Sequence, residues 1–421
     1  MTEFLPYGRQ TIDEADIAAV NSALADPLIT QGPRVESFER AFSEYVGARH
    51  AVAFANGTAA LHAAAHAAGL GPGDELLTTP LSFIASANCA LFLGARPRFC
   101  DIDPDSANLD LQSALRHGLP QQAKACVAVS MAGLPIDLEP LQEARREGLV
   151  VIEDASHALG ARRAGLPVGG DGAADMTTFS FHPVKAITSG EGGMVSTDDD
   201  VLAGALRSFR THGISRDEHK HDGTRDEHEQ DVMRGGWHYD IDSLGFNYRI
   251  TDFQCALGEQ QLTRLDEFIA ARRKIADRYR ELLGEIRQLR LPAAAGKPGT
   301  GHAYHLFVVR FREGASRRRA AYEHLRARGI GVQLHYIPIP VHGLYRSLGY
   351  TMEGLPATQA YYEEALSLPI FPAMTDEDVQ RVTRELRHAL DAPRWQAPAY
   401  AANTVESDGP NPNQSVESLH E

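Results

Sequence analysis

The residue with the clearest chemical context is Lys185, which follows a short apolar run and a proline in the segment Ser180–Lys185 (SFHPVK). A glycine cluster, Gly190–Gly193 (GEGG), comes shortly after it. Schiff-base chemistry needs an amine that is shielded enough to be neutral part of the time and that lies near a phosphate site. Ser180 offers a hydroxyl to such a phosphate. A lone lysine is most often a surface charge, so the interpretation of Lys185 depends on the residues that accompany it.

A carboxylate, Asp154, ends the apolar run Leu149–Glu153. Burying a carboxylate at the tip of a strand is costly unless a cation meets it. One interpretation is an aspartate that caps the next turn. The other is a partner for the protonated pyridine nitrogen of pyridoxal 5′-phosphate (PLP), which keeps that cofactor an electron sink. His157, one turn further on, either lies against the cofactor or is a packed polar residue.

The tripeptide Asn56-Gly57-Thr58 is expected where a strand turns into a helix. Gly57 lets backbone amides approach an anion, and Thr58 adds a hydroxyl at a helix N-terminus, whose dipole favours phosphate. An ordinary N-capped turn would use the same residues. The glycines of GLGPGDEL, starting at Gly69, follow a predicted helix and precede a predicted strand, which is the reverse of a dinucleotide-binding loop.

The elements that position these residues alternate short apolar runs with stretches of helical periodicity. The predicted strands are Ala51–Ala55, Glu75–Thr79, Arg96–Asp101, Ala125–Val129, Leu149–Glu153 and Met176–Phe181. The Ala- and Leu-rich stretch Thr58–Gly69 between the first two predicts a helix. This alternation predicts an α/β fold with a mainly parallel, buried sheet. Such sheets bind ligands at the carboxyl ends of their strands.

The chain is expected to divide into a large domain, residues 1–250, and a smaller C-terminal α/β domain, residues 251–391. Residues 392–421 lack periodicity and are predicted to be a disordered tail. Residues 212–240 are charged and histidine-rich, which predicts a lid-like surface loop. Its histidines also suggest a metal-binding lid, but the interleaved acidic and basic residues favour a solvated loop, so no metal is predicted. Those histidines are His212, His219, His221, His228 and His238.

Composition limits the class of protein. Of 421 residues, 43% are hydrophobic and 23% are charged, as in soluble globular proteins. The net charge of −15 argues against a nucleic-acid partner. No signal pattern or membrane-spanning run is found, and the cysteines show no C-x-x-C spacing, so a cytoplasmic protein with reduced thiols is expected. The cysteines are Cys89, Cys100, Cys126 and Cys255.

Four motifs in order resemble the DegT/StrS family of sugar aminotransferases, which are PLP-dependent transferases of fold type I. The motifs are Asn56–Leu61, Glu153–Ala158, Ser180–Lys185 and Phe246–Arg249, and the similarity covers roughly residues 5–390. The resemblance implies PLP as cofactor, with Lys185 binding it covalently and then moving the proton. It also implies that Asp154 pairs with the pyridine nitrogen.

The same resemblance assigns further cofactor contacts. His157 would contact the other edge of the cofactor, and Phe83 would stack on its ring. Its phosphate would be held by Gly57, Thr58 and Ser180. Asn247 would reach the phosphate of the neighbouring subunit's cofactor, which implies a homodimer with shared active sites.

Within this family the chain resembles the UDP-4-amino-4,6-dideoxy-N-acetyl-β-L-altrosamine transaminases of pseudaminic acid synthesis. The stretches that carry this are Leu5–Gln10, Thr30–Pro33 and His335–Pro338. The resemblance implies transfer of an amino group from L-glutamate to the keto carbon, C4, of a UDP-linked 4-keto-6-deoxy sugar. The residues that would line the sugar-nucleotide site are Tyr7, Thr30, Gln31, His335 and Tyr336.

Three alternatives remain open at this point. The substrate could be a GDP- or dTDP-linked keto sugar, since related enzymes share these motifs. A sugar dehydratase of the same family is disfavoured because that branch replaces the lysine with histidine. A PLP-binding regulatory protein without turnover is disfavoured by the intact set of lysine, aspartate and phosphate-binding residues.

Overall fold

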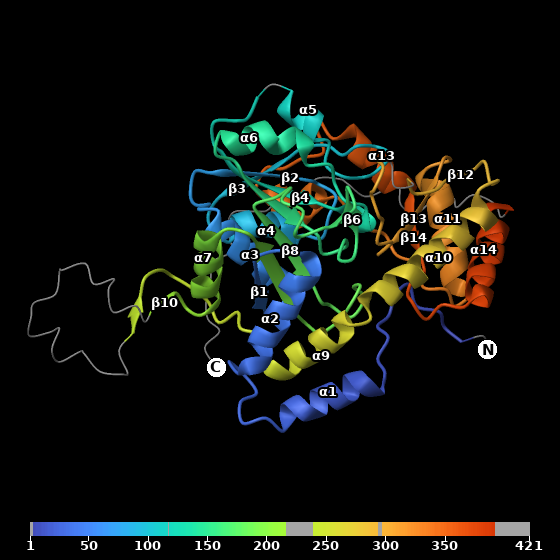
Figure 1. The fold of residues 1–421 in the computed structure, drawn as a ribbon. Helices are drawn as coiled ribbons and strands as arrows, with labels where there is room; N and C mark the ends of the chain where they lie inside the picture. The colour runs from blue at the N-terminus through green and yellow to red at the C-terminus, as the bar shows by residue number, and fades with distance from the viewer. Residues whose placement is uncertain (1–2, 117, 216–238, 294–296, 392–421) are drawn as a thin grey trace, which may run out of the picture.

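The computed structural model describes residues 3–116, 118–215, 239–293 and 297–391 (Figure 1). Residues 216–238 of the predicted lid-like loop, four of its five histidines among them, and the predicted tail 392–421 lie outside the described residues. None of the helices in the described ranges combines the length and the apolar character that a membrane crossing needs.

A seven-stranded sheet forms the centre of the larger part, in the order β1-β9-β8-β5-β4-β2-β3. Its strands are β1 His50–Phe54, β2 Glu75–Thr78, β3 Arg96–Phe99, β4 Ala123–Val129, β5 Val150–Asp154, β8 Met176–Ser180 and β9 Gly193–Thr197. The neighbours from β3 to β8 pair in parallel, whereas β9 is antiparallel to both β8 and β1. The predicted α/β class with a mainly parallel sheet is therefore confirmed.

Helices cover both faces of this sheet. Alternate side chains of β1 point to opposite faces and pack against different sets of helices. Val52 and Phe54 pack with the helices of one face, whereas Ala51 and Ala53 pack with those of the other. The first face carries α3 Gly57–Ala67, α4 Ala85–Leu91 and α7 Asp200–Arg210. The second carries α2 Pro33–Val46, α9 Asp252–Leu262, α5 Leu111–Leu115 and α6 Gln142–Arg146. Because both faces are buried, the strands are almost entirely small or apolar.

A smaller three-stranded antiparallel sheet, in the order β12-β13-β14, lies towards the C-terminus (Figure 1). Its strands are β12 Leu289–Arg290, β13 Phe307–Phe311 and β14 Ala365–Leu368. The helices around it are α10 Leu265–Leu283, α11 Ala315–Ala327, α12 Gly343–Ser347, α13 Pro356–Glu364 and α14 Asp376–Asp391. Helix α1, Glu14–Leu24, packs on α9. Two short strand pairs are β6 Arg162–Arg163 with β7 Leu166–Pro167 and β10 Ile214–Ser215 with β11 Asp240–Ile241. Short 3-10 turns lie at Met131–Gly133, Glu139–Leu141 and Ile339–Val341.

The long helix α10 takes part in both cores. Leu265 and Phe268, in its first turns, pack in the core on the second face of the large sheet. Ile275 and Tyr279, further along the helix, pack in the core of the small sheet. Leu5 also belongs to that second core, because its backbone pairs with Gly329 and Gly331. We therefore propose that the two parts of the chain meet within α10 instead of at residue 250.

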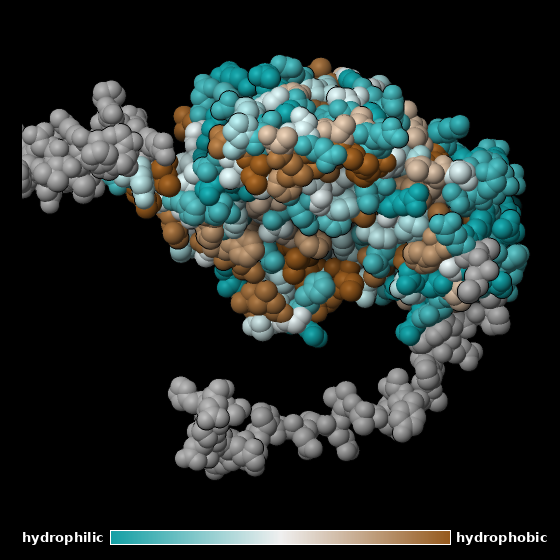
Figure 2. Space-filling view, turned by 90° about the horizontal axis from the view of Figure 1, so that it is seen from below, coloured by the Kyte–Doolittle hydropathy of each residue, from teal (hydrophilic) through white to brown (hydrophobic). Residues whose placement is uncertain are grey.

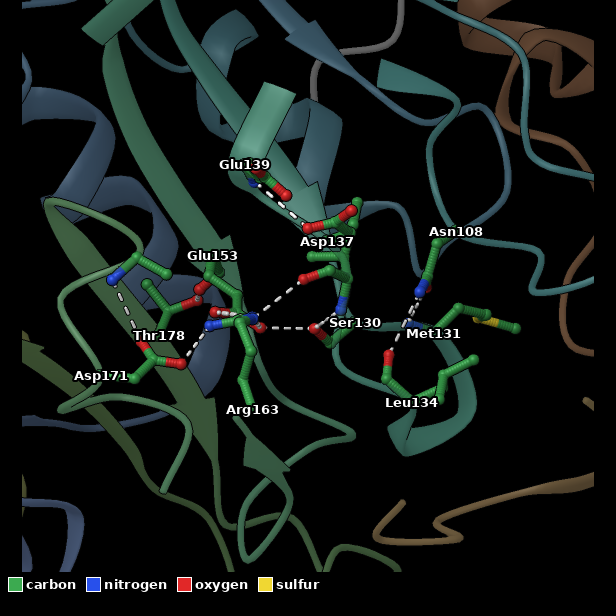
Figure 3. Close-up of polar contacts among 12 residues, drawn as sticks. Asn108, Ser130, Met131, Leu134, Asp137, Glu139, Glu153, Arg163, Asp171 and Thr178 are labelled. Atoms are coloured by element: carbon green, nitrogen blue, oxygen red, sulfur yellow. Dashed lines mark hydrogen bonds and ion pairs between the residues drawn. The ribbon is translucent and has the colours of Figure 1, made fainter. Parts of the chain in front are cut away.

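A buried ionic network lies beside the end of β5 (Figure 3). The Arg163 guanidinium donates to both carboxylate oxygens of Glu153 at 2.8 Å and also pairs with Asp171. Ser130 Oγ donates to Glu153 as well, at 2.5 Å. Burial raises the pKa of Glu153, and Arg163 opposes that rise. Removing one partner from such a network leaves a buried charge unpaired, which is far costlier than losing a surface ion pair.

We expect Arg163→Met to lower the free energy of unfolding by about 3–5 kcal/mol, because the Glu153 and Asp171 carboxylates would lose their cation. Urea unfolding followed by far-UV circular dichroism measures the change. Arg162→Met is the matched control, since the adjacent Arg162 is exposed and its guanidinium donates to the Gly165 carbonyl. An equal loss in both variants would contradict the role of the network.

Candidate active site

A cavity of about 800 Å³ opens at the carboxyl ends of the large sheet's strands. Its wall includes Val129 from the end of β4, Asp154 from the end of β5 and Ser180 from the end of β8. Residues after β1, from Asn56 onwards, complete this side. The cavity therefore lies where parallel α/β sheets bind their ligands.

The N-terminus of α3 forms an anion cradle in this wall. Asn56 caps the helix, its side-chain oxygen accepting from the Ala59 amide at 2.9 Å, while the first helical amides have no partner within the helix. Gly57 approaches Ser180 so closely that an added Cβ would lie 2.9 Å from the serine Cβ. Glycine is thus required for the two segments to meet. With the hydroxyls of Thr58 and Ser180 on the same wall, the donor set fits a phosphate group.

Asp154 presents a carboxylate to the cavity and accepts hydrogen bonds from two donors among the described residues. Its Oδ2 accepts from Ser86 Oγ at 2.8 Å, and its Oδ1 accepts from the Ser156 amide at 3.1 Å. Ser86 is held in turn by Ser82, whose Oγ lies 2.9 Å away. The side chain is 5% exposed. A nearly buried carboxylate fixed by hydroxyl and amide donors, without an arginine, suits a cationic ring nitrogen of a bound cofactor.

Lys185 brings an amine into the same cavity. Among the lysines of the described ranges, it alone lines this space. A turn in which the Lys185 amide donates to the His182 carbonyl at 2.8 Å fixes the backbone after β8. Burial lowers the pKa of Lys185 to about 8, with Asp154 opposing the fall and Arg272 adding to it. A sizeable fraction of the amine is therefore neutral and nucleophilic near neutral pH.

Neutral aromatic groups also line the cavity. His157 Nε2 lies 3.1 Å from the Tyr336 hydroxyl, and its buried Nδ1 has no hydrogen-bond partner among the described residues. Burial lowers the pKa of His157 well below its ordinary value, and it lowers that of His335 to about 3. The His335 ring is held by Ser367 Oγ at 2.8 Å from its Nδ1 and lies 5.4 Å from the Tyr7 ring. The unpartnered nitrogen of His157 is free to face a bound group.

Phe83 also lines the cavity, and its ring is 58% exposed. An exposed aromatic face beside an anion cradle and an isolated carboxylate fits the flat ring of PLP. The cradle, the carboxylate, the amine and the ring together match the phosphate, pyridine nitrogen, aldehyde and ring face of that cofactor.

Ten of the predicted site residues come together in this cavity. They are Tyr7, Gly57, Thr58, Phe83, Asp154, His157, Ser180, Lys185, His335 and Tyr336. Three others do not line it and are exposed at the surface, namely Thr30, Gln31 and Asn247. Thr30 pairs with Thr251, and Asn247 pairs with Thr211, each in an isolated bridge.

Sequence reasoning missed several residues of the site. Ser86 holds Asp154 directly, and Tyr248 lines the cavity with its hydroxyl 3.0 Å from His62 Nδ1. Ser82 precedes α4 and Ser86 lies within it, so no helical spacing in the sequence indicated the first contact. Tyr248 belongs to the motif Phe246–Arg249, but no contact was predicted for it.

Comparisons with known proteins agree with this geometry. The family model of the DegT/DnrJ/EryC1/StrS aminotransferases matches residues 10–387. The spore coat polysaccharide biosynthesis protein SpsC of Bacillus subtilis is 36% identical over 91% of this chain and 96% of its own length. The structure of Helicobacter pylori PseC, an aminotransferase involved in the biosynthesis of pseudoaminic acid, superposes with a TM-score of 0.83 and 29% identity over 92% of this chain and all of its own. Spr1654 from Streptococcus pneumoniae in its PLP form gives a TM-score of 0.83 and 26% identity over 92% of this chain and 99% of its own.

The predicted enzyme class, PLP cofactor and fold type are thereby confirmed, because the family and its solved members are PLP-dependent sugar aminotransferases. With its motifs gathered in one cavity and its whole fold shared with these enzymes, the chain belongs to the DegT/DnrJ/EryC1/StrS aminotransferase family.

Proposed function

We propose that this enzyme moves an amino group from L-glutamate to C4 of a UDP-linked 4-keto-6-deoxy sugar, in a pathway to pseudaminic acid. The observation that carries the proposal is the single cavity in which Lys185 and Asp154 face Tyr7, His335 and Tyr336. The likeness to PseC over nearly the whole chain supports the choice of sugar.

Lys185 and Asp154 act on the reacting groups. PLP, when bound, supplies a carbonyl that captures an amine and a ring that withdraws electrons from the carbon beside it. The Lys185 amine would hold the cofactor covalently and, when free of it, would take a proton from one carbon and return it to another. Asp154 holds a proton on the pyridine nitrogen by charge attraction. Gly57, Thr58 and Ser180 would hold the phosphate, and Asp154 would hold the pyridine nitrogen.

The neutral groups that line the cavity suit a sugar nucleotide. Burial keeps His335 neutral and raises the pKa of Tyr336, so both side chains offer uncharged hydrogen-bonding groups. Uncharged donors and acceptors suit sugar hydroxyls. Tyr7 adds an aromatic surface at which a sugar ring packs. A cavity of about 800 Å³ holds a cofactor together with a bulky substrate.

We also infer that two copies of the chain form a homodimer with shared sites. Asn247 is exposed and outside its own cavity, as a residue that serves a neighbouring site must be. Beside it, Leu244 is 81% exposed. Along α1 and the segment after it, Ile17 and Leu28 are each 54% exposed. Figure 2 looks from the side on which α1 lies, and apolar residues gather there in patches among polar ones. Exposed apolar patches of this kind are typical of association surfaces.

Borohydride reduction of the PLP-loaded enzyme should fix the cofactor to Lys185, and Lys185→Ala should lower transamination roughly 10²–10⁴-fold or more, because it removes both the covalent anchor and the acid–base group. Peptide mass mapping locates the adduct. Lys274→Ala, which changes an exposed lysine on α10, should retain activity. An adduct on any lysine other than Lys185 would show that the assignment is wrong.

Given L-glutamate and a panel of UDP-, GDP- and dTDP-linked 4-keto-6-deoxy sugars, the enzyme should aminate the UDP-linked sugar fastest. Mass spectrometry of the products detects the exchange of the keto oxygen for an amine, and NMR locates the aminated carbon. The Lys185→Ala protein is the control. Preference for a dTDP- or GDP-linked sugar would overturn the UDP assignment and leave the aminotransferase assignment intact.

Asn247→Ala should weaken PLP retention roughly 10–100-fold, the effect of losing one hydrogen bond to a charged group, while the dimer persists. Sedimentation velocity gives the oligomeric state, and absorbance during dialysis follows cofactor loss. Gln112→Ala, which changes an exposed amide side chain on α5, is the control. A fully active monomer would contradict the shared site, whereas normal retention in a dimer would contradict only the role of Asn247.

A further inference from the structure

Arg272, in the middle of α10, is a buried cation without a buried anion beside it. Its side chain is 1% exposed, and its guanidinium forms no ion pair with any described carboxylate. Its NH groups donate to backbone carbonyls instead. The acceptors are Ile370 at 2.9 Å, Tyr304 and His305 at 3.4 Å each, and Val184 at 3.5 Å.

Such a charge is expensive to keep, since burial disfavours the ionised form. Burial lowers the pKa of Arg272 to about 10, so the side chain still carries its charge near neutral pH. An apolar residue at this position in the middle of α10 would fill the same space without the cost of burying a charge. The retained charge therefore indicates a role other than packing.

The carbonyls that Arg272 contacts belong to segments far apart in the sequence. Val184 immediately precedes Lys185 in the loop after β8. His305 leads into β13, and Ile370 follows β14, both in the small sheet. One guanidinium thus joins the loop that carries the reactive lysine to the small sheet, from a helix that packs in both cores (Figure 1).

Fixed charges of opposite sign act on the Lys185 amine. Asp154, from β5, raises its pKa, whereas Arg272, from α10, lowers it, as burial also does. The imidazoles on the other elements packed around it, His157, His305 and His335, all have pKa values lowered by burial and add no positive charge near neutral pH. Arg272 is therefore the fixed cation that opposes Asp154.

We propose that Arg272 is a positioning residue for Lys185, whose buried positive charge favours the neutral amine while its carbonyl contacts hold the lysine loop against the small sheet. The proposal rests on the role of Lys185 proposed above. It adds that the balance between Asp154 and Arg272, and not burial alone, sets how much of the amine is nucleophilic.

Competitive labelling of the cofactor-free, full-length protein with acetic anhydride measures the titration of each lysine separately, over a pH range that brackets about 8 and 10.5. Peptide mass spectrometry resolves Lys185 from the other four lysines of the chain. Arg272→Gln and Arg272→Met should shift the titration of Lys185 upwards on the order of one unit, because a nearby cation is lost. Arg272→Lys keeps the charge and should leave it close to the wild type. Asp154→Asn should shift it downwards.

Arg273→Met is the matched control, because Arg273 is the next residue of α10 and also donates to a backbone carbonyl, that of His302. It should leave Lys185 unchanged. The Gln variant keeps a hydrogen-bond donor, and the Met variant keeps the apolar volume. Either variant, once circular dichroism shows that it is folded, tests the effect of the charge. An unshifted Lys185 in the neutral variants, an equal shift in Arg272→Lys, or a wild-type Lys185 that titrates at 10.5 would each overturn the proposal.

Labelling needs neither cofactor nor turnover, so its outcome is independent of the borohydride experiment. A Lys185 that responds to Arg272 but carries no cofactor adduct would refute the proposed function alone. An adduct on Lys185 with a titration indifferent to Arg272 would refute the present proposal alone.

Discussion

The attraction between the half-buried amine of Lys185 and the nearly buried carboxylate of Asp154 is the interaction on which the site depends. Neither group is stable alone at the edge of an apolar sheet, because each would lose its hydration without gaining a partner. The parallel strands bring them together, since β5 and β8 are neighbours that end on the same side. Once that pair is in place, the anion cradle at α3 and the neutral wall around His157 fix what else enters the cavity.

Much of the fold followed from local patterns, and the exceptions have physical reasons. The predicted strands Ala51–Ala55 and Met176–Phe181 agree with β1 and β8 within a residue at each end. The strand β9, which lies between them, was not predicted, because Gly193–Thr197 is short, begins with glycine and ends before acidic residues. Its stability comes from pairing with two strands remote in sequence, which no local pattern records.

The candidate site could be predicted where its residues immediately follow strands. Asp154, Ser180 and Lys185 are of that kind, because strand order alone brings them to one edge. Ser86 and Arg272 were missed, since each acts through packing between elements that the sequence does not order in space. Thr30 and Gln31 were expected to line the sugar-nucleotide site, and Asn247 was expected to reach the cofactor of a neighbouring subunit; a single chain leaves all three on its surface. A contact that needs a second copy cannot be read from the geometry of one.

The consecutive carboxylates of β5 have a consequence for how this family can vary. Because side chains alternate across a strand, Glu153 faces Arg163 on one side of the sheet while Asp154 faces the cavity on the other. Inserting or deleting one residue in β5 would exchange the two positions, putting the longer carboxylate in the cavity and the shorter one in the ionic network. Stability and chemistry would then fail together. We therefore expect this protein to tolerate changes of length in its loops but not in this strand.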